Sequence, residues 1–211
     1  MMLNFFEKII FRVTPKIILR RIIPSLEKYR FFKETLNTQT PITFDLWYNQ
    51  FVKGHNCNAH WPIHFTSRVI NPEKIYCGIE TSPGYSPGNY IQAIGEIYIG
   101  DYTQIAPNVG IISSNHSLED NRKHIVGKVY IGKYCWLGMG SIVLPNVKLG
   151  DFTVVAAGAV VTKSFDGYCV VGGNPAKVIK YLSKDNCIRH KSKFEYNGYI
   201  KNNIFKNDSN N

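Results

Sequence analysis

Aliphatic residues recur at every sixth place between positions 131 and 166. Written in sixes from Ile131, each repeat begins with Ile, Leu or Val, its second place is usually Gly, and its fifth is mostly a small residue or Val. A period of six fits neither an amphipathic helix nor a half-buried strand, whose periods are 3.6 and 2.0. It is typical of a parallel β-helix, in which short repeats form the flat sides of successive coils.

This register predicts which side chains face the core. Places one and five point inward and stack on their equivalents about 4.8 Å above and below, the usual spacing of strands. Gly at place two lets the backbone pass a corner without a Cβ clash. Asn146, which follows Pro145, is the residue next most tolerant of a left-handed backbone. Because one coil cannot bury its own core, several coils must stack.

The period weakens and fails at defined places. Repeat-like character begins near Ile63, slips, and resumes at Cys77. Segment 82–93 contains two Pro-Gly pairs and is predicted to be a loop. The interval from Ile99 to Ile131 is not a whole number of repeats, so segment 113–128 is predicted to leave the coil. Loops on rigid scaffolds frequently carry function.

The repeats end in a specific motif. Residues 173–179 read Gly-Asn-Pro-Ala-Lys-Val-Ile. The six repeats and this ending resemble the hexapeptide-repeat acyltransferases, in particular the maltose, galactoside and serine acetyltransferase branch. The resemblance covers roughly residues 60–182 and implies an all-β, left-handed parallel β-helix, the hand being that of the family.

The resemblance divides the chain into three parts. Residues 1–60 form an N-terminal helical and linker segment, residues 61–182 the β-helix domain, and residues 183–211 a polar, mobile tail. A short C-terminal helix is expected where segment 174–182 leaves the coil. The tail contains aromatic residues that would order part of it against the body: Phe194, Tyr196, Tyr199 and Phe205.

Segment 1–34 has a different pattern. Apolar residues recur at helical spacing with Lys and Arg between them, and Pro15 and Pro24 are predicted to divide the segment into short helices. One interpretation is a helix packed on the β-helix or on another subunit. The other is a basic amphipathic helix lying on an anionic membrane, which would place the protein near lipid-linked glycan precursors.

Composition narrows the class of protein. The 211 residues allow one domain with appendages, and the formal net charge is +10. Such a charge fits a solvated basic face or an anionic ligand such as coenzyme A, and no nucleic-acid motif is present. Five cysteines without a C-x-x-C pair favour a reducing cytoplasm over a disulfide framework or a zinc site. Neither a signal peptide nor an apolar run of about 18 residues is visible.

Acyl transfer to a hydroxyl needs a base that removes the acceptor's proton. His116 follows Ser113-Ser114-Asn115 at the mouth of segment 113–128. The resemblance implies that His116 is this base, although Ser117 stands where relatives have Pro. Its other ring nitrogen could be oriented by Glu119, by Asp120 or by a backbone carbonyl. His124 is expected to be a residue of the loop or its rim.

The resemblance also implies substrate contacts. The acceptor would meet Asn89, Asn115 and Trp136, although packing between subunits explains Trp136 equally well. Acetyl-CoA would lie along the last repeats, with Lys177 near the nucleotide phosphates, although Lys163 and Lys177 can equally be solvated charges. The expected donor-site residues are Gly140, Ala157, Thr162, Lys163 and Lys177.

The sequence therefore predicts an acetyl-CoA-dependent O-acetyltransferase that acts on a sugar hydroxyl of a surface polysaccharide or its precursor. We expect a cytoplasmic homotrimer, at the inner face of the membrane if residues 1–34 bind lipid, without a metal. The alternatives are an acetyltransferase of a free sugar or an amino-sugar nitrogen, and a non-catalytic β-helix scaffold. A β-helical carbonic anhydrase is disfavoured because it needs three His ligands, and His64 is far in sequence from His116 and His124.

Overall fold

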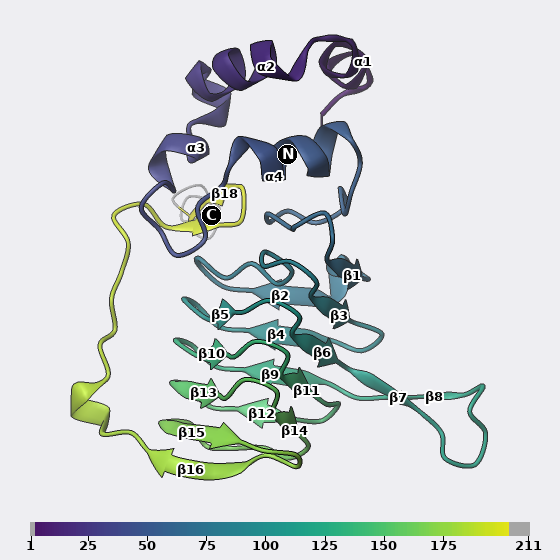
Figure 1. Ribbon diagram of the computed structural model, residues 1–211, viewed down its shortest axis with the longest axis vertical. Coiled ribbons are helices and arrows are strands. Elements are labelled where there is room, and N and C mark those ends of the chain that lie inside the picture. Colours follow the sequence, from purple (N-terminus) through teal and green to yellow (C-terminus); the bar gives the residue numbers. More distant parts are fainter. Residues whose placement is uncertain (1–2, 203–211) are drawn as a thin grey trace, which may run out of the picture.

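The computed structural model describes residues 3–202, and its main body is a stack of coils (Figure 1). Successive coils contribute short strands to three parallel sheets. Sheet A contains β1 (Arg68–Ile70), β3 (Tyr90–Gln92), β6 (Gly110–Ile112), β11 (Ile142–Val143) and β14 (Val160–Val161). Sheet B contains β2 (Ile75–Cys77), β4 (Ile97–Ile99), β9 (Val129–Ile131) and β12 (Lys148–Leu149). Sheet C contains β5 (Gln104–Ile105), β10 (Trp136–Leu137), β13 (Thr153–Val155), β15 (Cys169–Gly172) and the antiparallel β16 (Lys177–Tyr181).

The six-residue register is confirmed by burial. Ile142 pairs with Val160 and Trp136 with Val154, so one regular coil consists of three repeats. All first-place side chains are at most 3% exposed: Ile131, Leu137, Val143, Leu149, Val155 and Val161. Those at place five are at most 8% exposed: Cys135, Ser141, Val147, Thr153, Ala159 and Phe165. The predicted parallel β-helix of hexapeptide repeats is therefore correct.

Close spacing between coils requires glycine at place two. A Cβ on Gly150 would lie 2.1 Å from the carbonyl oxygen of Asp166, and one on Gly138 would lie 2.6 Å from the amide nitrogen of Ala157. The left-handed backbone occurs two places later in the repeat, where Asn146 has a φ of 65°. The expected conformation of Asn146 is thus confirmed, and place two is a site of close backbone approach.

Gly150→Ala should destabilise the coil by about 3 kcal/mol, because the added carbon overlaps a backbone atom that cannot move independently. Gly110→Ala is the matched control, since its Cβ would meet only Ile142 at an ordinary 3.6 Å. Thermal unfolding of the two variants tests this. Equal melting temperatures would contradict the steric explanation.

Two segments differ from the expected loops. Segment 82–93 contains β3, so only its first part is a loop. Segment 113–128 forms an antiparallel hairpin of β7 (Ser114–His116) and β8 (His124–Val126), which we call the arm. Ile97 pairs with Val129, whereas a regular coil of three repeats would place Asn115 beside it, so the arm is an insertion within one coil. Figure 1 shows the arm projecting sideways from the stack.

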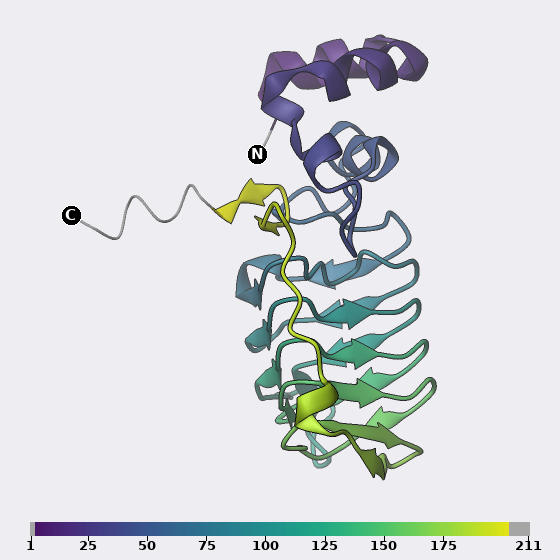
Figure 2. The same cartoon turned by 90° about the vertical axis from the view of Figure 1, so that its left-hand side faces the viewer.

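Short helices form an N-terminal module over the first coil (Figures 1 and 2). The indole ring of Trp47 packs against Tyr29, Phe32 and Phe44, with centroid distances of 5.3, 6.1 and 5.7 Å. Pro15 separates the first two helices, as predicted. The helical elements are α1 (Phe5–Val13), α2 (Lys16–Ile22), η1 (Ile23–Ser25), η2 (Glu27–Tyr29), α3 (Phe31–Glu34), α4 (Phe44–Trp47), the π-helical η3 (Tyr48–Val52), and η4 (Pro72–Lys74) below the module. Across residues 3–202, no helix is long and apolar enough to cross a bilayer.

The C-terminal segment corrects two expectations. Segment 174–182 holds the strand β16 where a short helix was expected, and a single 3-10 turn, η5 (Lys184–Asn186), follows. The chain then returns along the stack to the N-terminal module (Figure 2), where it forms β17 (Tyr196–Asn197) and β18 (Ile200–Lys201). Tyr196 and Tyr199 are 4% and 6% exposed, so this part of the predicted mobile tail is packed. Phe205 lies outside the described residues.

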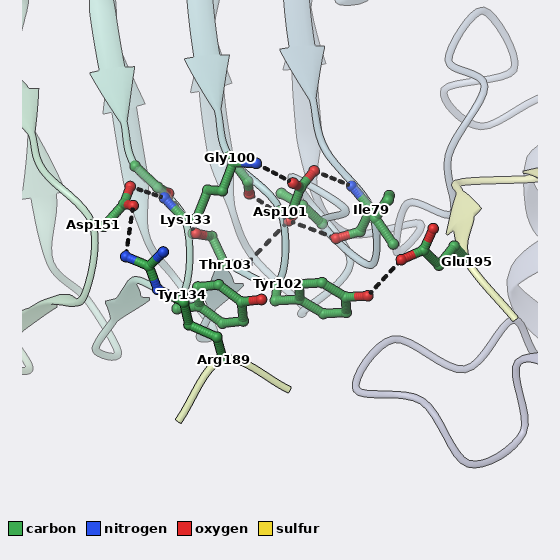
Figure 3. Close-up of polar contacts among 12 residues, drawn as sticks. Ile79, Gly100, Asp101, Tyr102, Thr103, Lys133, Tyr134, Asp151, Arg189 and Glu195 are labelled. Atoms are coloured by element: carbon green, nitrogen blue, oxygen red, sulfur yellow. Dashed lines mark hydrogen bonds and ion pairs between the residues drawn. The ribbon is translucent and has the colours of Figure 1, made fainter. Parts of the chain in front are cut away.

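An aromatic ladder at the corner between sheets B and C holds the returning chain. The rings of Tyr102, Tyr134, Phe152 and Tyr168 stack at centroid distances of 5.3, 4.9 and 5.2 Å. Figure 3 shows Arg189 beside this corner, 4.0 Å from Asp151, and Tyr102 donating a 3.4 Å hydrogen bond to Glu195. The tail therefore ties the last coil to the N-terminal module.

Glu34 links the module to the tail. Burial alone would raise the pKa of Glu34, but hydrogen bonds from Tyr196 and Lys201 outweigh it and lower that pKa. The stability that Glu34 contributes is therefore present above its unfolded-state pKa and is lost as the pH falls through the lowered folded value. Glu34→Gln should cost about 2 kcal/mol at neutral pH and reduce the acid sensitivity of unfolding. Glu27→Gln, at an 85% exposed carboxylate, should change neither; denaturant titrations at two pH values measure both.

Candidate active site

The arm leaves the coil at the corner between sheets A and B. Ser113 is fully buried at its root, where its hydroxyl donates to the carbonyl oxygens of Gln92 (2.8 Å) and Gly95 (2.9 Å). The same oxygen accepts from the amide of Gly95 (2.9 Å), and the amide of Gly127 donates to the Ser113 carbonyl (2.8 Å). These contacts fix both ends of the arm on the rigid stack.

His116 lies at the end of β7 with an exposed side chain. Its Nδ1 is 2.5 Å from the backbone carbonyl oxygen of Asn121, within the turn of the arm. A carbonyl can only accept, so in the neutral imidazole Nδ1 carries the proton and Nε2 the lone pair. In this form Nε2 of the exposed side chain is able to accept a proton.

Of the groups considered for orienting His116, the structure shows a backbone carbonyl, that of Asn121, in contact with its ring. Asp120 is instead held by Arg122, whose Nε and Nη2 donate to it at 2.9 and 3.1 Å. Hydrogen bonds from Arg122 lower the pKa of Asp120 and keep it ionised. A backbone carbonyl fixes the tautomer of His116 as well as a carboxylate would, without adding a charge.

His124 stands directly opposite His116 across the hairpin. The two residues are paired in register, and their ring centroids are 4.5 Å apart. Nδ1 of His124 lies 3.2 Å from the hydroxyl of Ser114. His124 thus lies within segment 113–128, as expected, and beside His116 in the arm.

The structure separates the expected acceptor residues. Asn89 is 1% exposed and its amide donates to the carbonyl of Ala106 (2.8 Å), so it supports the coil and is not open to an acceptor. Asn115 precedes His116 in β7, and side chains of successive strand residues point to opposite faces. Trp136 is 55% exposed, but it lies on sheet C, opposite the corner that bears the arm. Within one chain, none of the three is beside the outward nitrogen of His116.

The expected donor residues lie at both edges of sheet A. Gly140, Ala157 and Lys177 lie at the corner between sheets C and A, where the amide of Gly140 donates to the carbonyl of Pro107 (3.0 Å). Thr162 and Lys163 follow β14 at the corner between sheets A and B, two coils from the root of the arm. All five are exposed. The second group shares its corner with His116 and the first does not.

A groove that the sequence did not predict lies beside the root of the arm. It has a volume of about 500 Å³ and is lined by Lys74, Ile94, Glu96, Val126, Lys128 and Asn146, among others. Lys128 pairs with Glu96 at 2.6 Å, and Lys74 donates to the carbonyl of Ile94 (2.8 Å). Its residues come from four successive coils, and Lys74 falls where the repeat slips, so no local pattern marks them. Among residues 3–202, no three His, Cys, Asp or Glu side chains are grouped as metal ligands.

Comparison with known proteins agrees with this architecture. Residues 128–163 match the family model for the bacterial transferase hexapeptide, six repeats. Over 92 residues the chain is 37% identical to the galactoside O-acetyltransferase of Lactococcus lactis subsp. lactis, covering 42% of this chain and 44% of that enzyme. It is 28% identical over 160 residues to a probable macrolide acetyltransferase of Lysinibacillus sphaericus, covering 65% of this chain and 84% of the relative.

Among solved structures, the maltose O-acetyltransferase of Clostridium difficile 630 is 24% identical, with a TM-score of 0.48, covering 80% of this chain and 89% of that one. The match to the Lactococcus enzyme spans less than half of that protein's length. The agreement is concentrated in the repeats, where the coil register and the family model coincide. Residues 128–163 therefore carry the hexapeptide repeats of this family of bacterial transferases.

Proposed function

We propose that the protein is an acetyl-CoA-dependent O-acetyltransferase that acts on a sugar hydroxyl, in the synthesis of a surface polysaccharide or its precursor. The observation that carries the proposal is the contact between Nδ1 of His116 and the carbonyl of Asn121, which leaves Nε2 free as a base. The similarity to a galactoside O-acetyltransferase supports the class of acceptor.

In the proposed reaction, Nε2 of His116 removes the proton of a sugar hydroxyl as its oxygen attacks the thioester carbonyl carbon. The tetrahedral intermediate collapses, the carbon–sulfur bond breaks, and the proton passes from His116 to the departing thiolate. The products are the acetyl ester and coenzyme A. Thr162 and Lys163, at the corner of the arm, would hold the donor, and the Lys163 ammonium would face its phosphates.

A homotrimer would complete this site. The arm exposes apolar side chains, with Leu118, Ile125 and Val126 at 103%, 56% and 57% exposure. A two-stranded hairpin is marginally stable alone in water, so it is expected to pack on another surface. We propose that this surface is a neighbouring copy, which brings Trp136, Gly140, Ala157 and Lys177 of its own chain towards His116. Sedimentation equilibrium at micromolar concentration measures the stoichiometry, and a monomer would contradict this step.

The type of bond formed in the product, ester or amide, distinguishes the proposed O-acetyltransferase from its alternatives. Purified protein, acetyl-CoA and a panel of galactosides, maltosides and amino sugars are incubated, and free thiol and acetylated product are measured. An O-acetyl ester, which mild alkali removes, supports the proposal. An alkali-resistant amide favours transfer to an amino-sugar nitrogen. If no acceptor leads to release of free thiol, the protein is a non-catalytic β-helix scaffold.

We also propose that the N-terminal module contacts the inner face of a membrane through α1 and α2. The support is the exposure of apolar side chains that would normally face a core, together with the surrounding basic charge. Five free cysteines fit a protein of the reducing cytoplasm. This contact would bring the enzyme to polysaccharide precursors held on lipids.

A further inference from the structure

Helix α1 presents its apolar side to solvent. It contains no buried residue, and Phe5, Phe6, Ile9, Ile10 and Val13 are between 45% and 76% exposed. The stripe continues on α2 and beyond, where exposure is between 44% and 67% for Ile17, Ile18, Ile22 and Leu26. We call these nine side chains the apolar face. A surface helix normally turns such a stripe towards the core, so this one has a partner elsewhere.

The charge around the apolar face indicates which kind of partner would bind it. Residues 1–34 contain eight Lys and Arg but three Glu, and Asp45 of the module pairs with both Lys16 and Arg20, so these groups together carry a net charge of +4 (8 − 3 − 1). A second copy of the module would bring two positive surfaces together, whereas an anionic bilayer attracts each basic residue near its surface by about 1 kcal/mol. Arg21 is exposed on α2 beside Ile22, well placed to meet a phosphate. The chemistry therefore fits lipid headgroups better than another copy of this chain.

The apolar face also sets the direction of docking. α1 and α2 form the outermost layer at one end of the molecule, beyond α4 and the first coil (Figures 1 and 2). Leu19 and Ile23 are buried towards the module core, at 4% and 2% exposure, so the exposed side of α2 turns away from the β-helix. A bilayer that receives this face lies across the end of the stack, and the coils extend away from it.

The position of the arm then determines how far from the bilayer surface the reaction takes place. The arm leaves the third coil, two coil spacings beyond β1, and on the other side of β1 lie two layers of helices, α4 and then α1 with α2 (Figures 1 and 2). Coils repeat at about 4.8 Å and packed helices are about 10 Å apart, so His116 is held on the order of 30 Å from the headgroups. The N-terminal module acts as a spacer between membrane and site.

From this geometry we infer that the acceptor is a lipid-anchored saccharide acetylated on a sugar several units away from its lipid. The inference rests on the proposed function, which it deepens by naming the form of the acceptor. A sugar attached directly to the lipid headgroup would remain at the bilayer surface, below the reach of the arm. A longer chain, anchored at one end, would pass beside it.

The docking pose is tested independently of catalysis. Single fluorophores are placed at Ser25→Cys in the module, Glu119→Cys on the arm and Asp185→Cys near the last coil, all exposed positions. The background is full-length protein with Cys57→Ser and Cys187→Ser. Vesicles of phosphatidylglycerol and phosphatidylcholine carry a headgroup nitroxide that quenches only near contact. Quenching at position 25 alone is expected; quenching at 119 or 185, or at none of the three, would overturn the pose.

The acceptor is tested with a galactoside linked to lipid through a short or a long polyethylene glycol spacer, and with the same galactoside free in solution. On anionic vesicles, the long-spacer acceptor should be acetylated roughly tenfold faster than the short one, because only the long spacer spans the distance from the bilayer to the arm and so gives the galactoside a high effective concentration there. Equal rates with both spacers would refute the inference while leaving the activity intact. Failure of the free galactoside would count against the proposed function, and the quenching pattern would still decide the pose.

Discussion

Replacing His116 with alanine should lower kcat by two to four orders of magnitude, the usual contribution of a positioned general base. The folded structure should not change, because the side chain is exposed and its one hydrogen bond joins two parts of the same arm. The variant should therefore melt at the temperature of the parent and bind acetyl-CoA with similar affinity. Rates of thiol release and melting curves, measured on the same preparation, test both statements.

His124→Ala provides the matched control. This residue has the same chemistry, lies on the same hairpin and faces His116, but its Nδ1 contacts the Ser114 hydroxyl and no backbone carbonyl fixes its tautomer. We expect kcat to fall less than tenfold, because the His116 ring loses its packing contact with His124 but keeps its own chemistry. A larger loss in His124→Ala than in His116→Ala would show that His116 is not the base.

The double substitution Phe6→Ser and Val13→Ser should nearly abolish binding to anionic vesicles. The two side chains are 75% and 76% exposed, so their loss should leave the fold intact. Inserting both apolar side chains into the headgroup region would contribute about 3 kcal/mol, so partitioning should fall roughly a hundredfold. Co-sedimentation with vesicles containing phosphatidylglycerol measures the change.

Ile188→Ser is the control for this experiment, because it removes a similarly exposed apolar side chain, at 80% exposure, from the returning C-terminal segment. It should partition like the parent if the apolar face alone contacts lipid. Higher salt should weaken binding of the parent, since the basic residues act through screened charges. Pelleting of the double variant at the level of the parent would show that the apolar face is not the lipid contact.

Much of the coil could be predicted because its rules are local. Each repeat specifies its own inward residues, and equivalent places stack directly, so burial of Leu137 or Val155 follows from counting in sixes. The arm could be located because its insertion breaks the period between Ile97 and Val129. The hairpin formed by the arm could not be predicted, because no turn motif between Ser114 and Val126 fixes how its two strands pair.

What the sequence did not reveal depends on distant contacts. Asn89 resembles a residue available to substrate, yet its amide donates to the carbonyl of Ala106 across the corner. The tail is polar enough to predict disorder, but Tyr196 and Tyr199 find an apolar site formed by helices near the start of the chain. The carbonyl that orients His116 is a backbone group, and no side-chain pattern identifies such a partner.

Thermal unfolding against acetyl-CoA concentration tests the central claim most directly. A ligand that binds only the folded protein stabilises it by RT ln(1 + [L]/Kd), about 2.7 kcal/mol at a hundredfold excess over Kd. We predict a saturable rise in melting temperature that is retained in His116→Ala and reduced in Lys163→Glu. No rise at millimolar acetyl-CoA, in folded protein of defined oligomeric state, would contradict the assignment of an acetyl-CoA-dependent transferase.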